Sequence, residues 1–339
     1  MGVGAEQLSR TAQEMTSGVI LAADESGGTI KKRFEKIGVE SNPEANRAYR
    51  GLLFSTPGIS RYISGVILYD ETIRQKDGSD MPFARLLAGN GIVPGIKVDE
   101  GLEELEGLAP DKITKGLDGL ANRLNEYKNM GARFAKWRAT YTITADGSHP
   151  SSAILERNAR DLATYAAICQ ENGIVPIVEP EVLMDGDHDI DTCAKVTGEV
   201  LGIVFEELRR NKIHFSGMVL KPNMVVPGSD SVSQSTSEAV ANVTLEVLRA
   251  NVSPEVPGIA FLSGGLSANR ATEHLNAVNV SRNQNPEKYP WKRLTASFGR
   301  ALQSETLDAW GGKIENVVAA QAALLARAEK VFLASNGQL

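Results

Sequence analysis

The stretch Met218-Val219-Leu220-Lys221-Pro222-Asn223-Met224 joins an apolar run to a single lysine and then to a proline. Proline lacks the N–H that a sheet ladder needs, so a strand beginning near Ser216 is predicted to end here. Lys221 then lies at the carboxyl end of that strand, between apolar neighbours. A lysine in water is protonated, but desolvation and a nearby cation favour the neutral amine, which can attack a carbonyl. The alternative interpretation is a surface lysine that merely follows a strand.

Seven further apolar runs follow the same pattern, because each ends in polar or charged residues and helical stretches separate them. Near-continuous apolar runs are typical of parallel strands covered on both faces. The alternation predicts a (β/α)8 barrel, in which every strand's carboxyl end opens onto one face. The runs and their ends are 18–23 before Asp24-Glu25-Ser26, 64–69 before Asp70-Glu71, 92–96 before Lys97-Val98-Asp99, 132–135 before Lys136-Trp137-Arg138, 174–178 before Glu179-Pro180-Glu181, 258–262 before Ser263-Gly264-Gly265, and 294–296 before Ser297-Phe298-Gly299-Arg300.

The length of 339 residues suits a single TIM-barrel domain spanning residues 1–339, with extra terminal helices and a short tail from about residue 334. Apolar residues spaced by three and four mark helices, as from 117 to 127 and from 155 to 169. A doubly wound sheet is the runner-up. It usually carries a glycine-rich dinucleotide loop after an early strand, and the sequence has no G-x-G-x-x-G.

The composition argues against a broad nucleic-acid or anionic-membrane surface, because the net charge is −6 and the pI is near 5.5. A phosphorylated substrate would therefore need a local basic pocket. Cys169 and Cys193 lie in helical patterns and are predicted to be reduced, packed thiols. With no apolar run of membrane-spanning length, we expect a cytoplasmic protein without membrane partners.

Lysines end three of the predicted strands, at Lys97, Lys136 and Lys221. Gathering three ammonium groups at one mouth costs free energy unless some are neutral or an anion binds. The predicted mouth is therefore a candidate site for an anionic substrate.

Seven segments in this order resemble class I fructose-1,6-bisphosphate aldolase, and the resemblance covers nearly the whole chain. Two connecting segments, Gly-Leu-Asp-Gly-Leu (116–120) and Asp-Gly-Asp-His-Asp (185–189), match as well. The seven are Ile-Leu-Ala-Ala-Asp-Glu-Ser (20–26), Gly-Ile-Lys-Val-Asp (95–99), Phe-Ala-Lys-Trp-Arg (134–138), Pro-Ile-Val-Glu-Pro-Glu (176–181), Leu-Lys-Pro-Asn-Met-Val (220–225), Phe-Leu-Ser-Gly-Gly (261–265) and Phe-Gly-Arg-Ala-Leu-Gln (298–303).

The resemblance implies a lyase without metal or cofactor, which reversibly cleaves fructose 1,6-bisphosphate to dihydroxyacetone phosphate and glyceraldehyde 3-phosphate in glycolysis and gluconeogenesis. It implies that Lys221 forms a Schiff base with the C2 ketone and that Glu179 is the general acid/base. Asp24 would face the C4 hydroxyl, and Lys136 would be the cation near the imine. It also implies a homotetramer. The implied substrate ligands are Ser263, Gly264, Gly265 and Arg300 for the C1 phosphate, Arg33, Lys97 and Arg47 for the other phosphate, and Arg138, Glu181 and Ser297 elsewhere at the mouth.

The sequence also supports interpretations of single residues, and for Glu181 and Arg47 it leaves two interpretations open. Apolar Val178 beside Glu179 predicts a raised pKa for that carboxyl, as proton transfer near neutrality requires. Glu181 either positions the catalytic groups or pairs with Arg138. Arg47 is as consistent with a helix surface as with a ligand. Asp185-Gly-Asp-His-Asp189 lacks the ligand spacing of an EF-hand and is predicted to be a solvated turn.

The sequence also departs from the family. Many members end in a tyrosine that reaches the active site, whereas no tyrosine follows Tyr289 here. Late proton exchange and the preference between the bisphosphate and fructose 1-phosphate are thus left open. Glu100 stands where a lysine is common.

Other functions fit the sequence less well. A zinc-dependent class II aldolase needs histidine ligands, but the four histidines lie away from the strand ends. The motif order argues against deoxyribose-phosphate aldolase and transaldolase. A non-catalytic scaffold for partners such as actin has no sequence feature of its own.

Overall fold

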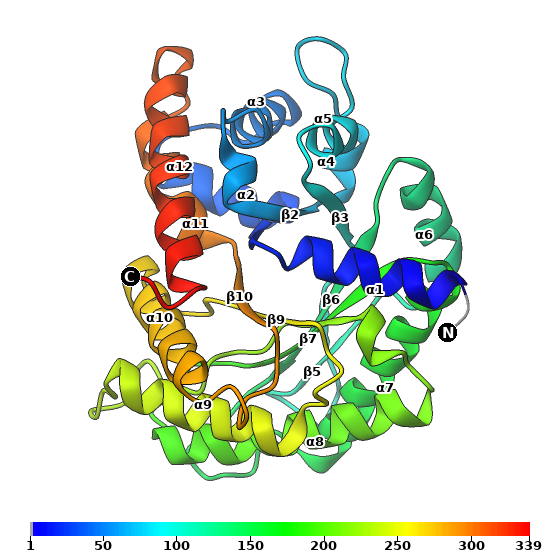
Figure 1. Ribbon diagram of the computed structural model, residues 1–339, viewed down its shortest axis with the longest axis vertical. Helices are drawn as coiled ribbons and strands as arrows, with labels where there is room; N and C mark the ends of the chain where they lie inside the picture. Colours follow the sequence, from blue (N-terminus) through cyan, green and yellow to red (C-terminus); the bar gives the residue numbers. More distant parts are fainter. Residues whose placement is uncertain (1–2) are drawn as a thin grey trace.

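The computed structural model describes residues 3–339, and its centre is a closed barrel of eight parallel strands (Figure 1). The strands follow one another around the barrel in sequence order, and pairing of the last with the first closes it. This confirms the predicted (β/α)8 fold. The strands are β1 Val19–Ala22, β2 Ile63–Leu68, β3 Val93–Lys97, β6 Phe134–Tyr141, β7 Val175–Val182, β8 Val219–Leu220, β9 Gly258–Phe261 and β10 Arg293–Phe298.

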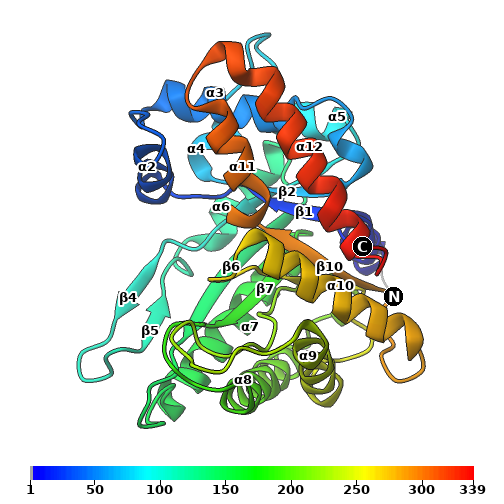
Figure 2. The same ribbon diagram turned by 90° about the vertical axis from the view of Figure 1, so that its left-hand side faces the viewer.

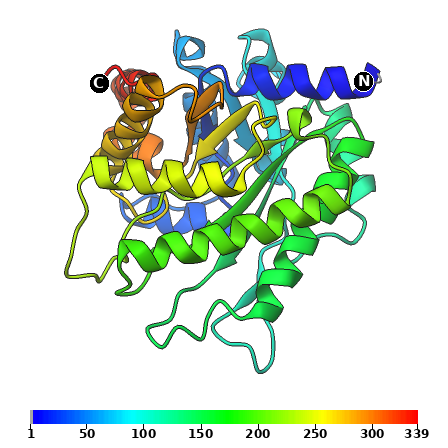
Figure 3. The same cartoon turned by 60° about the horizontal axis from the view of Figure 1, so that its bottom comes forward.

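Helices cover the outside of the barrel, as Figure 3 shows for the long helices beside one part of the sheet. Local sequence sets their starts: Asn42 accepts a hydrogen bond of 2.8 Å from the backbone N–H of Ala45, and Pro43 occupies the first helical position. The helices are α2 Gly27–Glu35, α3 Pro43–Phe54, α4 Asp70–Arg74, α5 Phe83–Gly89, α6 Leu120–Asn129, α7 Ser152–Glu171, α8 Ile190–Arg210, α9 Ser237–Asn251, α10 Ala268–Gln284, α11 Arg300–Trp310 and α12 Val317–Ala334, with short 3-10 turns at Ile59–Arg61, Phe215–Gly217 and Ile314–Asn316.

The first helix, α1 (Val3–Met15), closes the amino-terminal end of the barrel. Its buried residues Leu8, Ala12 and Met15 share one apolar cluster with inward-facing strand residues such as Ile20 and Val219. Burying such side chains is worth about 1.5–3 kcal/mol each. Because α1 closes this end of the barrel, we expect polar groups to bind a ligand at the opposite mouth.

The strands β6 and β7 run several residues further than predicted, because a charged residue does not end a strand whose side chains alternate between faces. Lys136 and Arg138 lie inside β6, and Glu179 and Glu181 lie inside β7. Between the two cations of β6, Trp137 is fully buried and stacks on Tyr165 of α7 at a centroid distance of 5.5 Å. Charged residues therefore face the barrel mouth while their neighbours pack outward against helices.

The sequence did not predict the antiparallel hairpin β4 (Leu102–Glu104) and β5 (Lys112–Thr114), which projects from the barrel in Figure 2. Cys169 and Cys193 are free and buried, as predicted. Within residues 3–339, no helix has the length and apolar character needed to cross a membrane.

Candidate active site

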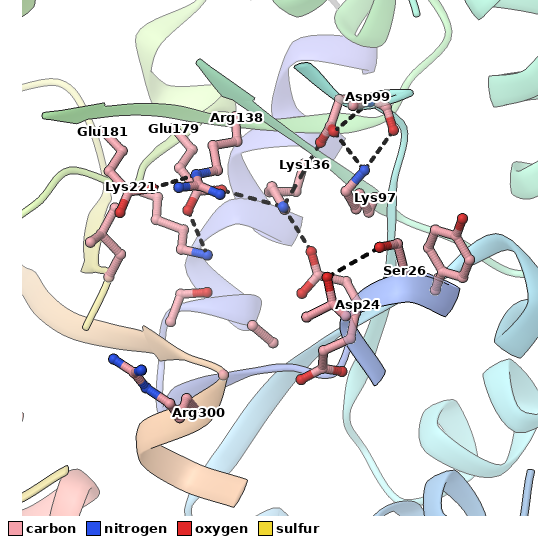
Figure 4. A pocket seen from close by; sticks show the side chains of 18 of the residues that line it. Asp24, Ser26, Lys97, Asp99, Lys136, Arg138, Glu179, Glu181, Lys221 and Arg300 are labelled. Carbon is pink, nitrogen blue, oxygen red and sulfur yellow. Dashed lines mark hydrogen bonds and ion pairs between the residues drawn. The ribbon is translucent and has the colours of Figure 1, made fainter. Parts of the chain in front are cut away.

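A cavity of about 1180 Å³ opens at the carboxyl ends of the strands. Every residue predicted for the site lines it except Arg47. Figure 4 shows Lys221, Lys136 and Asp24 in the middle, with Arg300 on one side and Lys97 with Asp99 on the other. The cavity therefore places charged groups on either side of a central lysine and carboxylate cluster.

Lys221 is 4% exposed, and its ammonium group meets a carboxylate of the neighbouring strand. Nζ of Lys221 lies 3.0 Å from Oε1 of Glu179. The segment is fixed on both sides, since the backbone N–H of Lys221 donates to Val178 and that of Leu262 donates to Pro222. The strand β8 thus ends at Leu220, before the proline, as predicted, and Lys221 points into the mouth. Its start differs from the prediction, since Ser216 lies in a 3-10 turn and the strand begins at Val219.

Lys136 is surrounded by carboxylates. Its Nζ lies 2.7 Å from Oδ2 of Asp24, 3.4 Å from Oε2 of Glu179 and 3.9 Å from Oδ2 of Asp99. Burial lowers the pKa of Lys136, but these three carboxylates outweigh it and hold the pKa well above its ordinary value. Lys136 is therefore a permanent cation beside Lys221.

Asp24 follows β1 and is a largely buried anion, with its side chain 13% exposed. Burial raises its pKa, whereas the ammonium groups of Lys136, Lys221 and Lys97 lower it, and the net pKa lies well below the ordinary value. A carboxylate held ionised in this way is available as a proton acceptor.

The two carboxyls of β7 have pKa values shifted in opposite directions. Burial pushes the pKa of Glu179 upward, but Lys221, Lys136 and Arg138 together hold it below the ordinary value. The predicted rise in that pKa is therefore wrong, because three cations outweigh the apolar neighbour. Burial does raise the pKa of Glu181, even though the Arg138 side chain contacts it directly. Of the two interpretations of Glu181, the structure thus shows the pairing with Arg138.

A fourth carboxylate at this mouth, Asp99, was not predicted as a site residue. Its Oδ1 lies 2.5 Å from Nζ of Lys97, and its side chain is buried. Lys97 and Lys136 occupy paired positions on the neighbouring strands β3 and β6, so one carboxylate can serve both. The sequence carried a signal, since Asp99 closely follows a strand-end lysine.

The loop after β9 and the start of α11 form a small pocket wall at the Arg300 side of the cavity. Gly264 has φ +51°, a left-handed conformation that glycine adopts without strain. Nη2 of Arg300, the first residue of α11, donates to the carbonyl of Gly264 at 2.9 Å. Backbone N–H groups at a glycine-rich turn and a helix N-terminus, beside an arginine, are a suitable phosphate site.

Comparison with known proteins agrees with this geometry. Residues 7–339 match the family model described as fructose-bisphosphate aldolase class-I. The chain is 52% identical to cytosolic fructose-bisphosphate aldolase 5 of Arabidopsis thaliana, over 96% of this chain and 90% of the relative. It is 47% identical to a probable class 1 fructose-bisphosphate aldolase of Xanthomonas campestris, over 98% of both chains.

A solved structure gives the same result in three dimensions. Fructose-bisphosphate aldolase of Plasmodium falciparum, in complex with TRAP and a small-molecule inhibitor, superposes with a TM-score of 0.96. It is 46% identical, and the match covers all of this chain and 96% of that chain. The chain belongs to the class I fructose-bisphosphate aldolase family. Class I aldolases are metal-independent. Among residues 3–339 of this aldolase, no group of three or more His, Cys, Asp or Glu side chains is placed to hold a metal ion.

Two residues of the aldolase remain outside the central cluster. Arg47 pairs with Glu44 on the exposed face of α3, with nitrogen and oxygen 2.6 Å apart, and does not line the cavity. Asp70 lines an outer part of the cavity and bonds to Arg74 and to the hydroxyl of Tyr127. The helix-surface interpretation of Arg47 thus agrees with its position.

Proposed function

We propose that this chain catalyses the reversible aldol cleavage of fructose 1,6-bisphosphate through a Schiff base on Lys221. The observation that carries the proposal is the buried Lys221–Glu179 contact at 3.0 Å, beside Lys136 and Asp24. Family membership supplies the reaction, and this contact supplies an amine next to a proton carrier.

In the first step the Lys221 ammonium passes a proton to Glu179, and the resulting amine attacks the C2 carbonyl. Protonated Glu179 then returns the proton to the hydroxyl of the carbinolamine, which leaves as water. The product is a protonated imine. Glu179 is suited to this because it is ionised before the reaction and lies within hydrogen-bond reach of the lysine.

In the second step the Asp24 carboxylate accepts the proton of the C4 hydroxyl. The C3–C4 bond breaks, its electrons move into the protonated imine, and glyceraldehyde 3-phosphate leaves. Lys136 stabilises the charges on Asp24 and Glu179 as protons move. Protonation of the enamine and hydrolysis of the imine then release dihydroxyacetone phosphate and restore Lys221.

The phosphates determine the orientation of the substrate. We assign the C1 phosphate to Ser263, Gly264, Gly265 and Arg300, because C2 must lie at Lys221 and C1 is adjacent to it. Lys97, on the opposite side of the central cluster in Figure 4, is assigned to the far phosphate. Ser297 and Arg138 also line the cavity.

The names of its relatives support a proposal for the cellular setting of the enzyme. We place the protein in the cytosol, because the Arabidopsis relative and one from Spinacia oleracea, 50% identical, are named cytosolic or cytoplasmic isozymes. A homotetramer is proposed from the family resemblance. Its partners would be sugar phosphates, with no role for nucleic acid or membranes.

Borohydride trapping tests the assignment. With dihydroxyacetone phosphate present, reduction should add the mass of the reduced adduct to the peptide that contains Lys221. Lys221→Met should lose both the label and cleavage of fructose 1,6-bisphosphate while its circular dichroism spectrum stays unchanged. Labelling at another lysine, or near-normal turnover by the variant, would overturn the proposal.

A further inference from the structure

A second, largely buried charge cluster lies at the wall of the active-site cavity, which two of its members, Glu25 and Arg33, line, and it takes no part in the mechanism above. We call it the Glu25 cluster; it consists of Glu25, Arg33, Arg50 and Gln303. Glu25 is 8% exposed and Arg50 is 2% exposed. Glu25 directly follows the candidate base Asp24 in sequence. Its side chain contacts two arginines and a glutamine, whereas that of Asp24 contacts Lys136.

One carboxylate holds three side chains. Oε1 of Glu25 contacts the Arg33 guanidinium and accepts a hydrogen bond of 2.9 Å from Nε2 of Gln303. Oε2 lies 2.5 Å from Nη2 of Arg50. Because these partners come from α2, α11 and α3, Glu25 joins three helices to the end of β1.

Arg33 extends from this cluster towards the phosphate wall. A Cβ added at Gly299 would lie 3.7 Å from Nη2 of Arg33, and Gly299 directly precedes Arg300. The Arg33 side chain is 22% exposed, whereas that of Glu25 is 5% exposed. The guanidinium is thus anchored on its buried side and reaches the start of α11 on its open side. This location favours the C1 phosphate over the far phosphate, to which the family resemblance had assigned Arg33.

The charge balance of the cluster suits a phosphate. One carboxylate between two guanidinium groups leaves one positive charge uncompensated, and a buried arginine without an anion is costly. Gln303 adds a fixed contact, because its Nε2 also donates to the carbonyl of Ala22 at 2.8 Å. The cluster therefore keeps Arg33 in place while preserving a net positive charge at the wall.

We propose that Glu25 is a positioning residue for phosphate recognition, which acts by holding Arg33 at the C1-phosphate wall beside Gly299 and Arg300. This inference rests on the proposed Schiff-base function. It predicts that the loss of the Glu25 charge weakens binding of the phosphate group and leaves the reaction of Lys221 with a ketone unchanged.

Two ketones separate these effects, because dihydroxyacetone phosphate carries the C1 phosphate and dihydroxyacetone does not. The measurement is the concentration of each ketone that gives half-maximal borohydride labelling of Lys221. Glu25→Gln should raise this concentration about tenfold for dihydroxyacetone phosphate, the loss expected when a charge-assisted hydrogen bond no longer orients an arginine. The concentration of dihydroxyacetone that gives half-maximal labelling should be the same in Glu25→Gln and in the unaltered protein.

A double-variant cycle tests whether Glu25 acts through Arg33. In an Arg33→Ala background, Glu25→Gln should cause no further change for dihydroxyacetone phosphate. A matched control is Glu246→Gln, which also removes a carboxylate that contacts two cations and a tyrosine hydroxyl, but on the outer helix α9. Glu246→Gln should leave the half-maximal labelling concentration unchanged for both ketones. If Glu25→Gln does not fold, Glu25→Asp keeps the charge but shortens the reach, and should show the same selective loss.

Each other outcome has a definite meaning. The positioning role is overturned if Glu25→Gln leaves the half-maximal concentration of dihydroxyacetone phosphate unchanged or shifts it equally for both ketones. It is also overturned if Glu25→Gln has its full effect in the Arg33→Ala background. Failure of the proposed function looks different, since the unaltered protein would then show no labelling of Lys221 with either ketone.

Discussion

Replacing Lys136 with methionine should destabilise the fold by leaving a buried carboxylate without its partner. Methionine keeps much of the length of the lysine side chain and removes the charge. Glu179 would retain Lys221 at 3.0 Å and Asp99 would retain Lys97 at 2.5 Å. Asp24 would lose the ammonium at 2.7 Å, and residues 3–339 provide no other cation within 4.0 Å of it.

The magnitude follows from this imbalance. Removing one partner of a buried ion pair costs about 3–5 kcal/mol. The Asp24 side chain is 13% exposed, so partial solvation favours the lower end of that range. We expect the free energy of unfolding to fall by about 3 kcal/mol at pH 7.

The loss should depend on pH with a definite sign. The folded-state pKa of Asp24 is lowered, so its contribution is present above the unfolded pKa near 4 and is lost as pH falls towards the folded value. The folded-state pKa of Lys136 is raised, so its contribution is complete below about 10.5 and is lost only as pH rises through the folded value. In Lys136→Met the pKa of Asp24 moves upward. The difference in free energy of unfolding between the unaltered protein and Lys136→Met should therefore decrease by about 1 kcal/mol when the pH is lowered from 7 to 4.

Urea titration followed by tryptophan fluorescence measures the effect at both pH values. Lys112→Met is the control, because Lys112 forms an exposed pair with Glu104 at 3.1 Å and should change stability by less than about 0.5 kcal/mol. In an Asp24→Asn background the cost of Lys136→Met should shrink. The reasoning is refuted if Lys136→Met lowers the free energy of unfolding equally in both backgrounds and if this loss is not smaller at pH 4 than at pH 7.

Three further predictions concern phosphate binding, packing and metals. Arg300→Ala should raise the half-saturating concentration of dihydroxyacetone phosphate in borohydride trapping at least about tenfold, and an unchanged value would remove Arg300 from the phosphate site. Gly95→Ala should cost about 1–3 kcal/mol in urea titration, because the added Cβ would lie 2.2 Å from the Phe134 ring, whereas Gly89→Ala, with nothing within 4 Å, should be nearly neutral. Cleavage should continue undiminished after dialysis against EDTA, as measured by a coupled assay; lost activity that zinc restores would contradict a metal-independent enzyme.

Local patterns in the sequence determined the barrel and most of its mouth. Eight apolar runs with polar ends predicted eight parallel strands, because a sheet covered on both faces needs apolar residues throughout. Pro222 predicted the end of β8 and hence the place of Lys221, since proline removes a ladder hydrogen bond at its own position. Each of these inferences depends on neighbours in sequence.

Tertiary structure alone decided how the charges balance. Val178 beside Glu179 predicted a raised pKa, but Lys221, Lys136 and Arg138 arrive from other strands and lower it. Glu25 meets Arg50 and Gln303, which are far away along the chain, and its role is visible only when three helices converge. Electrostatic energies depend on distances and burial in space, which spacing along the chain does not specify.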